Sequence, residues 1–274
     1  AFVRKFQGKE QNAPAAIHGL LQDVNDQHDA ALAQLNVENP MAARVATLVH
    51  SNANSKITTS NRIMVLQDAT QTYPALIAAM EQATSSIHLS YYIWNGDTFG
   101  ARLLAVLAKK VSQGVAVRIL YDPVGSFSGL GWRYLRKARA AGIEIRPFSA
   151  LWRVHTISYR NHRKIAVIDG AVGFTGGLNI GNEHLDPPLG FARWRDTHIR
   201  LTGSAVWSLQ SVFLIDWANA TDEILDPASL FPAVTQEDHA ANLAVQICLS
   251  GPDTEYAAIR QLYFELIVSA KSQV

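Results

Sequence analysis

His162 and Lys164 are two positions apart at the start of an apolar run, Lys164 to Asp169, that is typical of a β-strand. Side chains at positions i and i+2 of a strand point to the same face, so the imidazole and the ammonium group are expected to project together. A histidine beside a fixed cation is a poor metal ligand. The pair suits phosphate chemistry instead, because the cation binds non-bridging oxygens while a neutral ring nitrogen attacks phosphorus. The spacing therefore predicts a site that reacts with a phosphoryl group.

The segment that follows adds groups that suit an anion. Val172 to Thr175 is typical of a second strand, joined to the first by a tight turn at Asp169. Gly176 and Gly177 would let the backbone approach an anion closely, and the Asn179 amide can donate a hydrogen bond to a phosphoryl oxygen. Because these groups lie on two adjacent strands, we expect them to converge with the histidine and lysine pair.

The elements that must position these groups alternate regularly from about residue 61. The expected strands are 63–66, 87–94, 115–121, 143–148, 164–169, 172–175 and 195–201. The expected helices are 73–82, 100–111, 132–141 and 204–218. This alternation predicts an α/β fold in which a mixed β-sheet is flanked by helices.

The chain is expected to divide into three parts. Residues 1–60 are helix-prone and polar and are expected to form a helical, juxtamembrane segment; residues 61–240 hold the α/β domain. In residues 241–274, an apolar strand, a polar turn and a helix that begins with a tyrosine repeat the order in which the domain opens. We interpret this part as the start of a truncated second copy of the fold; the alternative is a coincidence between two ordinary strand and helix units.

Composition excludes several classes of protein. With 48% hydrophobic and 17% charged residues, the chain is neither disordered nor stapled by disulfides, and the single cysteine, Cys248, cannot form an intrachain disulfide. The net charge of +1 gives no overall electrostatic case for nucleic acid. No stretch approaches the roughly 18 consecutive apolar residues of a membrane span, and the run Val212 to Ile215 is interrupted by Asp216.

The motif His162-x-Lys164-x4-Asp169, followed by Gly176-Gly177-x-Asn179, resembles the HKD signature of the phospholipase D superfamily. Neighbouring phrases resemble its bacterial cardiolipin synthase branch; they are Tyr91 to Trp94, Arg118 to Asp122, Asn161 to Ile165, Phe174 to Gly181 and Trp194 to His198. The resemblance implies one half, the amino-terminal one, of a pseudo-twofold phospholipase D-like fold.

The resemblance also implies roles for individual residues. His162 would be the nucleophile that forms a phosphohistidine, or else the acid partner, and Lys164 would bind phosphate together with Asn179 and the two glycines. Asp169 belongs to the catalytic motif, but we expect it to be structural. Asp196 is expected to orient the imidazole through Nδ1–H, with Glu183 in reserve. No metal and no cofactor are implied.

The reaction implied by the family joins two phosphatidylglycerol molecules and gives cardiolipin and glycerol. It needs a second histidine, which would come from a second HKD half beyond this chain or from a homodimer partner. Phosphatidylglycerol and the membrane are the expected partners, without nucleic acid. The segment from Phe2 to Lys9 looks like a basic juxtamembrane exit. Because members of the family commonly carry two transmembrane helices upstream, the resemblance implies a bacterial cell membrane location, with the active site at the cytoplasmic face. The alternatives are a phosphodiesterase or nuclease working as a single-motif homodimer, and a catalytically incomplete lipid-binding fragment.

Overall fold

The computed structural model describes residues 15–149, 161–185, 195–251 and 256–274, with side chains from residue 24 onward. The basic segment from Phe2 to Lys9 lies outside these ranges, and so does Trp194. The chain forms two compact units. The first comprises residues 1–62, 203–208 and 234–274; the second comprises residues 63–202 and 209–233.

The second unit is built on a mixed sheet, seven-stranded within the described ranges, in the order β2-β8-β7-β6-β3-β4-β5. The strands are β2 (Asn61–Gln67), β3 (Ser86–Tyr91), β4 (Ala116–Tyr121), β5 (Glu144–Pro147), β6 (Lys164–Ile168), β7 (Val172–Gly176) and β8 (Thr197–Gly203). β3, β4 and β5 pair in parallel, whereas β6 pairs antiparallel with both β3 and β7. This confirms the expected α/β fold with a mixed sheet flanked by helices.

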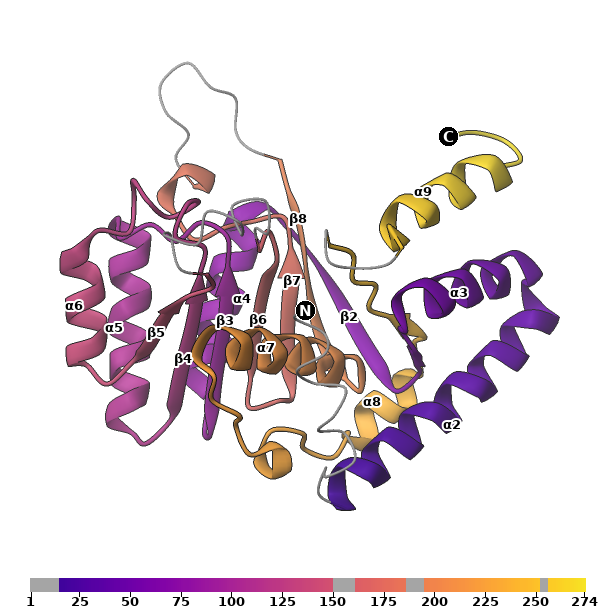
Figure 1. Ribbon diagram of the computed structural model, residues 1–274, viewed down its shortest axis with the longest axis horizontal. Helices are drawn as coiled ribbons and strands as arrows, with labels where there is room; N and C mark the ends of the chain where they lie inside the picture. The colour runs from indigo at the N-terminus through magenta and orange to yellow at the C-terminus, as the bar shows by residue number, and fades with distance from the viewer. Residues whose placement is uncertain (1–14, 150–160, 186–194, 252–255) are drawn as a thin grey trace. The chain divides into compact units, whose positions relative to one another are not determined.

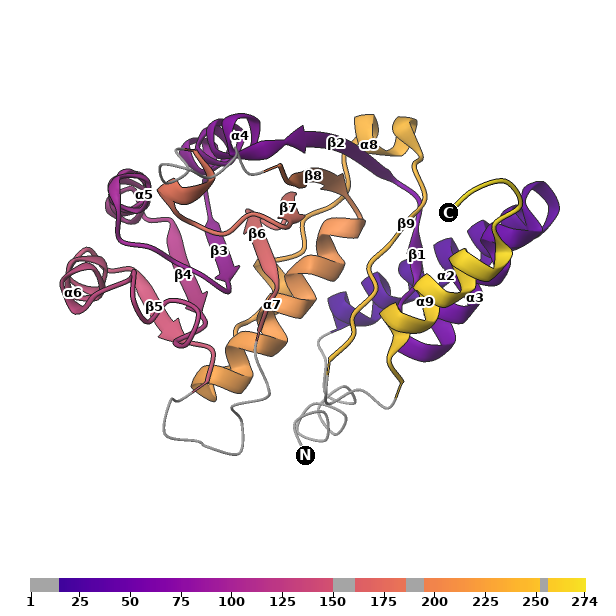
Figure 2. The same cartoon turned by 90° about the horizontal axis from the view of Figure 1, so that it is seen from above.

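Helices cover both faces of this sheet (Figure 1, Figure 2). One face carries α4 (Asp68–Gln82), α5 (Thr98–Ser112) and α6 (Trp132–Ala140); the other carries α7 (Ala205–Thr221). Among the described residues, the short 3₁₀ helices η3 (Asn182–His184) and η4 (Pro227–Ser229) lie in connections. The faces follow from alternation along β3, because Ile87 and Leu89 pack into the core under α4 and α5, while His88 stacks on Phe213 of α7.

The strand register brings three strand termini together at one end of the sheet, and this end carries the candidate site. Tyr91, the last residue of β3, pairs with Lys164, the first residue of β6. Tyr91 also pairs with Tyr121, the last residue of β4. The chain therefore leaves β3 and β4, and enters β6, at the same end of the sheet.

One helix of this unit starts earlier than its sequence predicts. We expected a helix from Tyr73, but α4 begins at Asp68 although Pro74 lies inside it. Pro74 removes only the donor that would bond the Thr70 carbonyl, and side chains near the start of the helix bond to backbone groups of Gln67 and Asp68. Thr72 Oγ1 donates to the Asp68 carbonyl at 2.9 Å, and Gln71 Oε1 accepts from the Gln67 N–H at 2.7 Å.

The first unit contains α2 (Ala15–Glu38), α3 (Pro40–Ala53), β1 (Ile57–Thr58), α8 (Gln236–Ala241), β9 (Val245–Gln246) and α9 (Ala258–Ser269). β1 pairs antiparallel with β9, and Ala31, Ala46 and Ile57 form a small core. α3 ends at Ala53, where Asn54 caps the helix in the left-handed conformation at φ 49°.

Candidate active site

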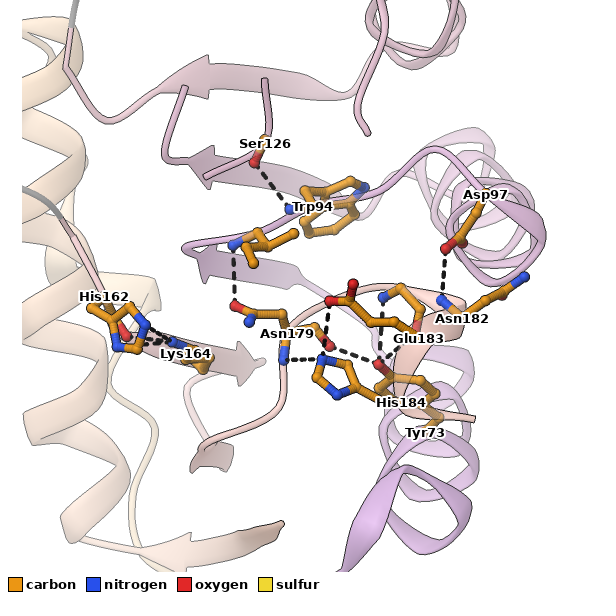
Figure 3. A network of polar contacts seen from close by, with 12 residues as sticks. Tyr73, Trp94, Asp97, Ser126, His162, Lys164, Asn179, Asn182, Glu183 and His184 are labelled. Carbon is orange, nitrogen blue, oxygen red and sulfur yellow. Dashed lines mark hydrogen bonds and ion pairs between the residues drawn. The ribbon is translucent and has the colours of Figure 1, made fainter. Parts of the chain in front are cut away.

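His162 and Lys164 lie side by side at the end of the sheet where β6 begins (Figure 3). Lys164 Nζ is 3.1 Å from each ring nitrogen of His162 and donates a hydrogen bond to the His162 carbonyl at 2.8 Å. Lys164 is 3% exposed, whereas His162 is exposed to solvent. The structure thus holds an ammonium group in a fixed position beside an accessible imidazole.

Burial lowers the pKa of both groups, and the ammonium group of Lys164 adds to the shift of His162. Burial lowers the pKa of Lys164 to about 8, against the opposing effect of the Asp196 carboxylate. Burial and the neighbouring ammonium group of Lys164 both lower the pKa of His162 below its usual value. At neutral pH the imidazole is therefore uncharged, which is the form with a lone pair available for attack.

The ring of Tyr92 lies beside both His162 and Lys164. Its ring centroid lies 4.7 Å from the ring of His162, and Lys164 Nζ lies 5.5 Å from the same tyrosine ring. An aromatic face close to an ammonium group stabilises its charge. The sequence analysis gave Tyr92 no role. Two consecutive tyrosines at a strand end were a usable signal, because neighbouring strand residues face opposite sides and one of the two rings can therefore point away from the other.

Asn179 is held by three hydrogen bonds (Figure 3). Its side-chain oxygen accepts from the Ile93 N–H at 3.1 Å, its own N–H donates to His184 Nε2 at 3.3 Å, and its carbonyl accepts from the Tyr73 hydroxyl at 2.7 Å. Because the side-chain oxygen is engaged, the NH₂ end of the amide is the end directed elsewhere. A buried asparagine fixed in this way can present a donor to an anion without reorganising.

Gly176 and Gly177 make room for β8. A Cβ on Gly176 would lie 2.5 Å from both His198 Nδ1 and the Thr197 carbonyl, and a Cβ on Gly177 would overlap the Asp196 carboxylate. The nearest groups that the two glycines admit are therefore protein groups of the neighbouring strand.

Asp196 lies just before β8 and is tied to the start of α4. The Asp196 N–H donates to Asp68 Oδ1 at 2.7 Å, and the Asp68 N–H donates to the Asp196 carbonyl at 3.1 Å. The Asp196 Oδ1 accepts from the Thr197 N–H at 2.6 Å. Within the described residues, Asp196 and His162 share no hydrogen bond. Glu183 contacts a different histidine, with Oε1 3.5 Å from His184 Nε2.

Asp169 lies at the other end of β6 from Lys164. Its carboxylate accepts five hydrogen bonds from the backbone and hydroxyl groups of Thr84, Ser85 and Ser86, at 2.7 to 3.0 Å. Burial alone would raise the pKa of Asp169, but these hydrogen bonds outweigh it and hold the pKa below its usual value. The carboxylate thereby joins the turn after β6 to the start of β3.

A further polar cluster anchors the chain on either side of His162. The Asp216 carboxylate on α7 accepts from Arg163 Nη1 at 2.9 and 2.8 Å and from Asn161 Nδ2 at 3.2 Å. Sequence reasoning missed this cluster because Asp216 is 53 positions from Arg163. The available signal was the interruption of the apolar run from Val212 to Ile215 by a carboxylate.

Within the described residues, no three His, Cys, Asp or Glu side chains are grouped so that they would hold a metal ion. In the same part of the chain, no helix is both long enough and apolar enough to cross a bilayer.

The family model described as "Cardiolipin synthase, PLD-like domain" matches residues 76–188. The chain is 46% identical over 233 residues to a cardiolipin synthase of Halalkalibacterium halodurans, covering 83% of this chain and 45% of that protein. It is 42% identical over 242 residues to a cardiolipin synthase of Geobacillus thermodenitrificans, covering 86% and 48%. The chain thus spans about half the length of the curated relatives that it matches.

The fold resembles that of solved structures at low sequence identity. The phosphatidylserine synthase of Haemophilus influenzae superposes with a TM-score of 0.53 at 14% identity, covering 83% of this chain and 58% of that one.

Proposed function

Since this chain belongs to the phospholipase D superfamily and its relatives include curated cardiolipin synthases, we propose that it supplies one half of an active site that makes cardiolipin. The reaction transfers a phosphatidyl group between two phosphatidylglycerol molecules and releases glycerol. The observation that carries the proposal is the pairing of an exposed, uncharged His162 with a fixed Lys164 ammonium group at 3.1 Å.

In the first step, a ring nitrogen of His162 attacks the phosphorus of the donor lipid. A phosphorus–nitrogen bond forms, the bond from phosphorus to the glycerol oxygen breaks, and an acid from the second half of the site protonates that oxygen. Lys164 and the Asn179 amide bind the non-bridging oxygens, beside the backbone of Gly176 and Gly177.

In the second step, the terminal hydroxyl of another phosphatidylglycerol attacks the phosphohistidine. The phosphorus–nitrogen bond breaks, the hydroxyl proton passes to the group that acted as acid, and His162 returns to its uncharged form. Water in place of this alcohol would give phosphatidic acid, so the alternative phosphodiesterase reading differs only in the acceptor.

The carboxylates have different roles in this proposal. Asp169 is structural, which its five hydrogen bonds to Thr84, Ser85 and Ser86 support. Asp196 keeps Lys164 charged, in line with its opposing effect on the Lys164 pKa, and orients the imidazole once phosphate has displaced the ammonium group from the ring. Glu183 remains the reserve because its contact is with His184.

The proposal needs a second histidine from another HKD half. We propose that a second copy of the fold provides it, beginning near residue 241 after a domain over residues 61–240, with a homodimer as the alternative. The proposal also makes the protein membrane-associated, in line with its relatives, and puts the site at the cytoplasmic face where phosphatidylglycerol is available.

The test is to incubate the full-length protein with phosphatidylglycerol and to measure cardiolipin and glycerol formed in equal amounts. His162→Ala should abolish both products, while the exposed surface variant Glu81→Ala should leave them unchanged. Cardiolipin formation at the wild-type rate by His162→Ala would contradict the mechanism. Cleavage of single-stranded DNA without cardiolipin formation would favour the nuclease alternative.

A further inference from the structure

The loop between β4 and α6 holds a phenylalanine outward on a fixed backbone. Asp122 Oδ1 accepts a hydrogen bond from the Val124 N–H at 2.8 Å, and Ser126 Oγ accepts one from the Trp94 N–H at 3.0 Å. Phe127 nevertheless is 78% exposed. A large apolar side chain kept in water by an ordered loop is a feature of binding surfaces.

Helix α6 continues this exposed surface with a tryptophan among arginines. Trp132, its first residue, is 62% exposed, and the guanidinium groups of Arg136 and Arg133 lie 4.7 and 5.7 Å from its ring centroid. Tyr134 and Ala138 form the buried face of the helix. The outer face of its first turns therefore combines an aromatic ring with cations.

The start of α6 carries an excess of positive charge. Residues 132–137 contain three exposed cations, Arg133, Arg136 and Lys137, and no acid, whereas the whole chain has 24 Lys and Arg against 23 Asp and Glu. A local excess of this size attracts an anionic partner.

The surface lies at the same end of the sheet as the candidate active site. The loop leaves β4 at Tyr121, in register with Tyr91 and, through it, with Lys164, and α6 begins where the loop ends. Figure 1 shows α6 beside α5 next to the edge strand β5.

One layer of packing separates the loop from the nucleophile. A Cβ on Gly125 would lie 2.5 Å from the Tyr92 carbonyl and 3.0 Å from the Tyr92 ring, and this ring lies 4.7 Å from the ring of His162. A bilayer held by the loop would thus lie close to the reacting imidazole.

We propose that Val124, Phe127, Trp132, Arg133 and Arg136, together called the docking edge, bind the surface of an anionic phospholipid bilayer. Aromatic side chains fit the headgroup boundary, and arginines near an anionic leaflet are attracted to its charge. The inference deepens the proposed function, on which it rests for its role, because it holds the site against a membrane that contains the substrate. Binding to vesicles tests it without any turnover.

The test is sedimentation of the 274-residue chain with vesicles of phosphatidylcholine, with and without 30 mol% phosphatidylglycerol. We expect binding to the anionic vesicles that weakens with added salt, and little binding to phosphatidylcholine alone. Arg133→Gln with Arg136→Gln should lower the affinity for anionic vesicles about tenfold or more. Phe127→Ser with Trp132→Ser should lower it as well, with unchanged thermal midpoints.

A matched control removes the same charge elsewhere. Lys109→Gln with Arg139→Gln also removes two exposed cations, from the ends of α5 and α6 that lie away from the docking edge. This double variant should bind within about twofold of the parent chain. Equal loss in both double variants, no binding to anionic vesicles, or a soluble complex with a second copy of the chain that depends on Phe127 and Trp132 would each overturn the proposal.

A second comparison separates this inference from the proposed function. In His162→Ala, vesicle binding should remain while cardiolipin formation by the full-length protein is lost. If the full-length protein makes no cardiolipin, the binding experiment still has its own outcome. If turnover is present but the docking-edge variants bind like the parent, only the docking edge is wrong.

Discussion

Asp216 accepts hydrogen bonds at 2.9 and 2.8 Å from Nη1 of Arg163, the residue that directly follows His162 in the chain. The same carboxylate accepts from Asn161, the residue that directly precedes His162. One side chain on α7 therefore anchors both chain neighbours of His162, while the imidazole itself is exposed to solvent. In the proposed mechanism this placement matters because a misplaced nucleophile loses rate steeply.

Replacement of Asp216 by alanine should affect both stability and activity. Asp216 is largely buried and Arg163 about one-third exposed, so loss of the acceptor should lower the free energy of unfolding by about 2 to 4 kcal/mol. Urea denaturation of the 274-residue chain measures this. Glu81→Ala, which removes an exposed acid from α4, should stay within about 0.5 kcal/mol of the parent. Equal stability of the two variants would show that the anchor contributes nothing.

Asp169→Asn should destabilise the chain in a pH-dependent way. Asn fits the left-handed backbone at this position (φ 52°) but accepts fewer hydrogen bonds, so stability at pH 7 should fall by about 1 to 3 kcal/mol. Because the folded-state pKa of Asp169 is depressed, its stabilisation is present above the unfolded value near 3.9 and is lost as the pH falls through the folded value. Urea titrations at pH 7 and pH 3 should show the difference between parent and variant shrinking at the lower pH; a constant difference would contradict this account.

The pH dependence of kcat/KM should have two limbs. Below the lowered pKa of His162 the imidazole is protonated and cannot attack, so the acid limb should rise toward neutrality with its midpoint below the ordinary histidine value of 6.5. Above about 8 Lys164 loses its proton and no longer neutralises phosphate, so the rate should fall. Initial rates of the full-length protein on detergent-dispersed phosphatidylglycerol measure both limbs. Lys164→Arg, though slower, should lose the alkaline limb; a limb that stays near pH 8 belongs to another group.

Gly177→Ala should reduce activity through Asp196. Gly177 does not have a positive φ, so alanine strains no backbone, but its Cβ would overlap the Asp196 carboxylate. We expect each of Gly177→Ala and Asp196→Ala to lower kcat/KM, and the double variant to be no worse than Asp196→Ala. The coupling free energy should reach about 1 kcal/mol or more. Additive effects would show that the glycine acts independently of the carboxylate.

The α/β fold could be predicted from the sequence because its signals are local. Apolar runs between glycine and proline turns located β3, β4, β6 and β7 within a few residues, since strand and helix periodicities are properties of short segments. The early start of α4 before Pro74 could not be predicted, because the side chains of Gln71 and Thr72 stabilise it by hydrogen bonds to the backbone of Gln67 and Asp68.

For the candidate site, the sequence by itself determined that an imidazole and an ammonium group two residues apart on a strand would project together. By resemblance, it also indicated the superfamily to which such a pair belongs. Only the tertiary structure decided that Tyr92 packs against both groups, that Asp196 fills the space left by Gly177, and that Asp216 anchors the neighbours of His162. These contacts join residues tens of positions apart, and they depend on strand register and helix placement, which no local pattern specifies.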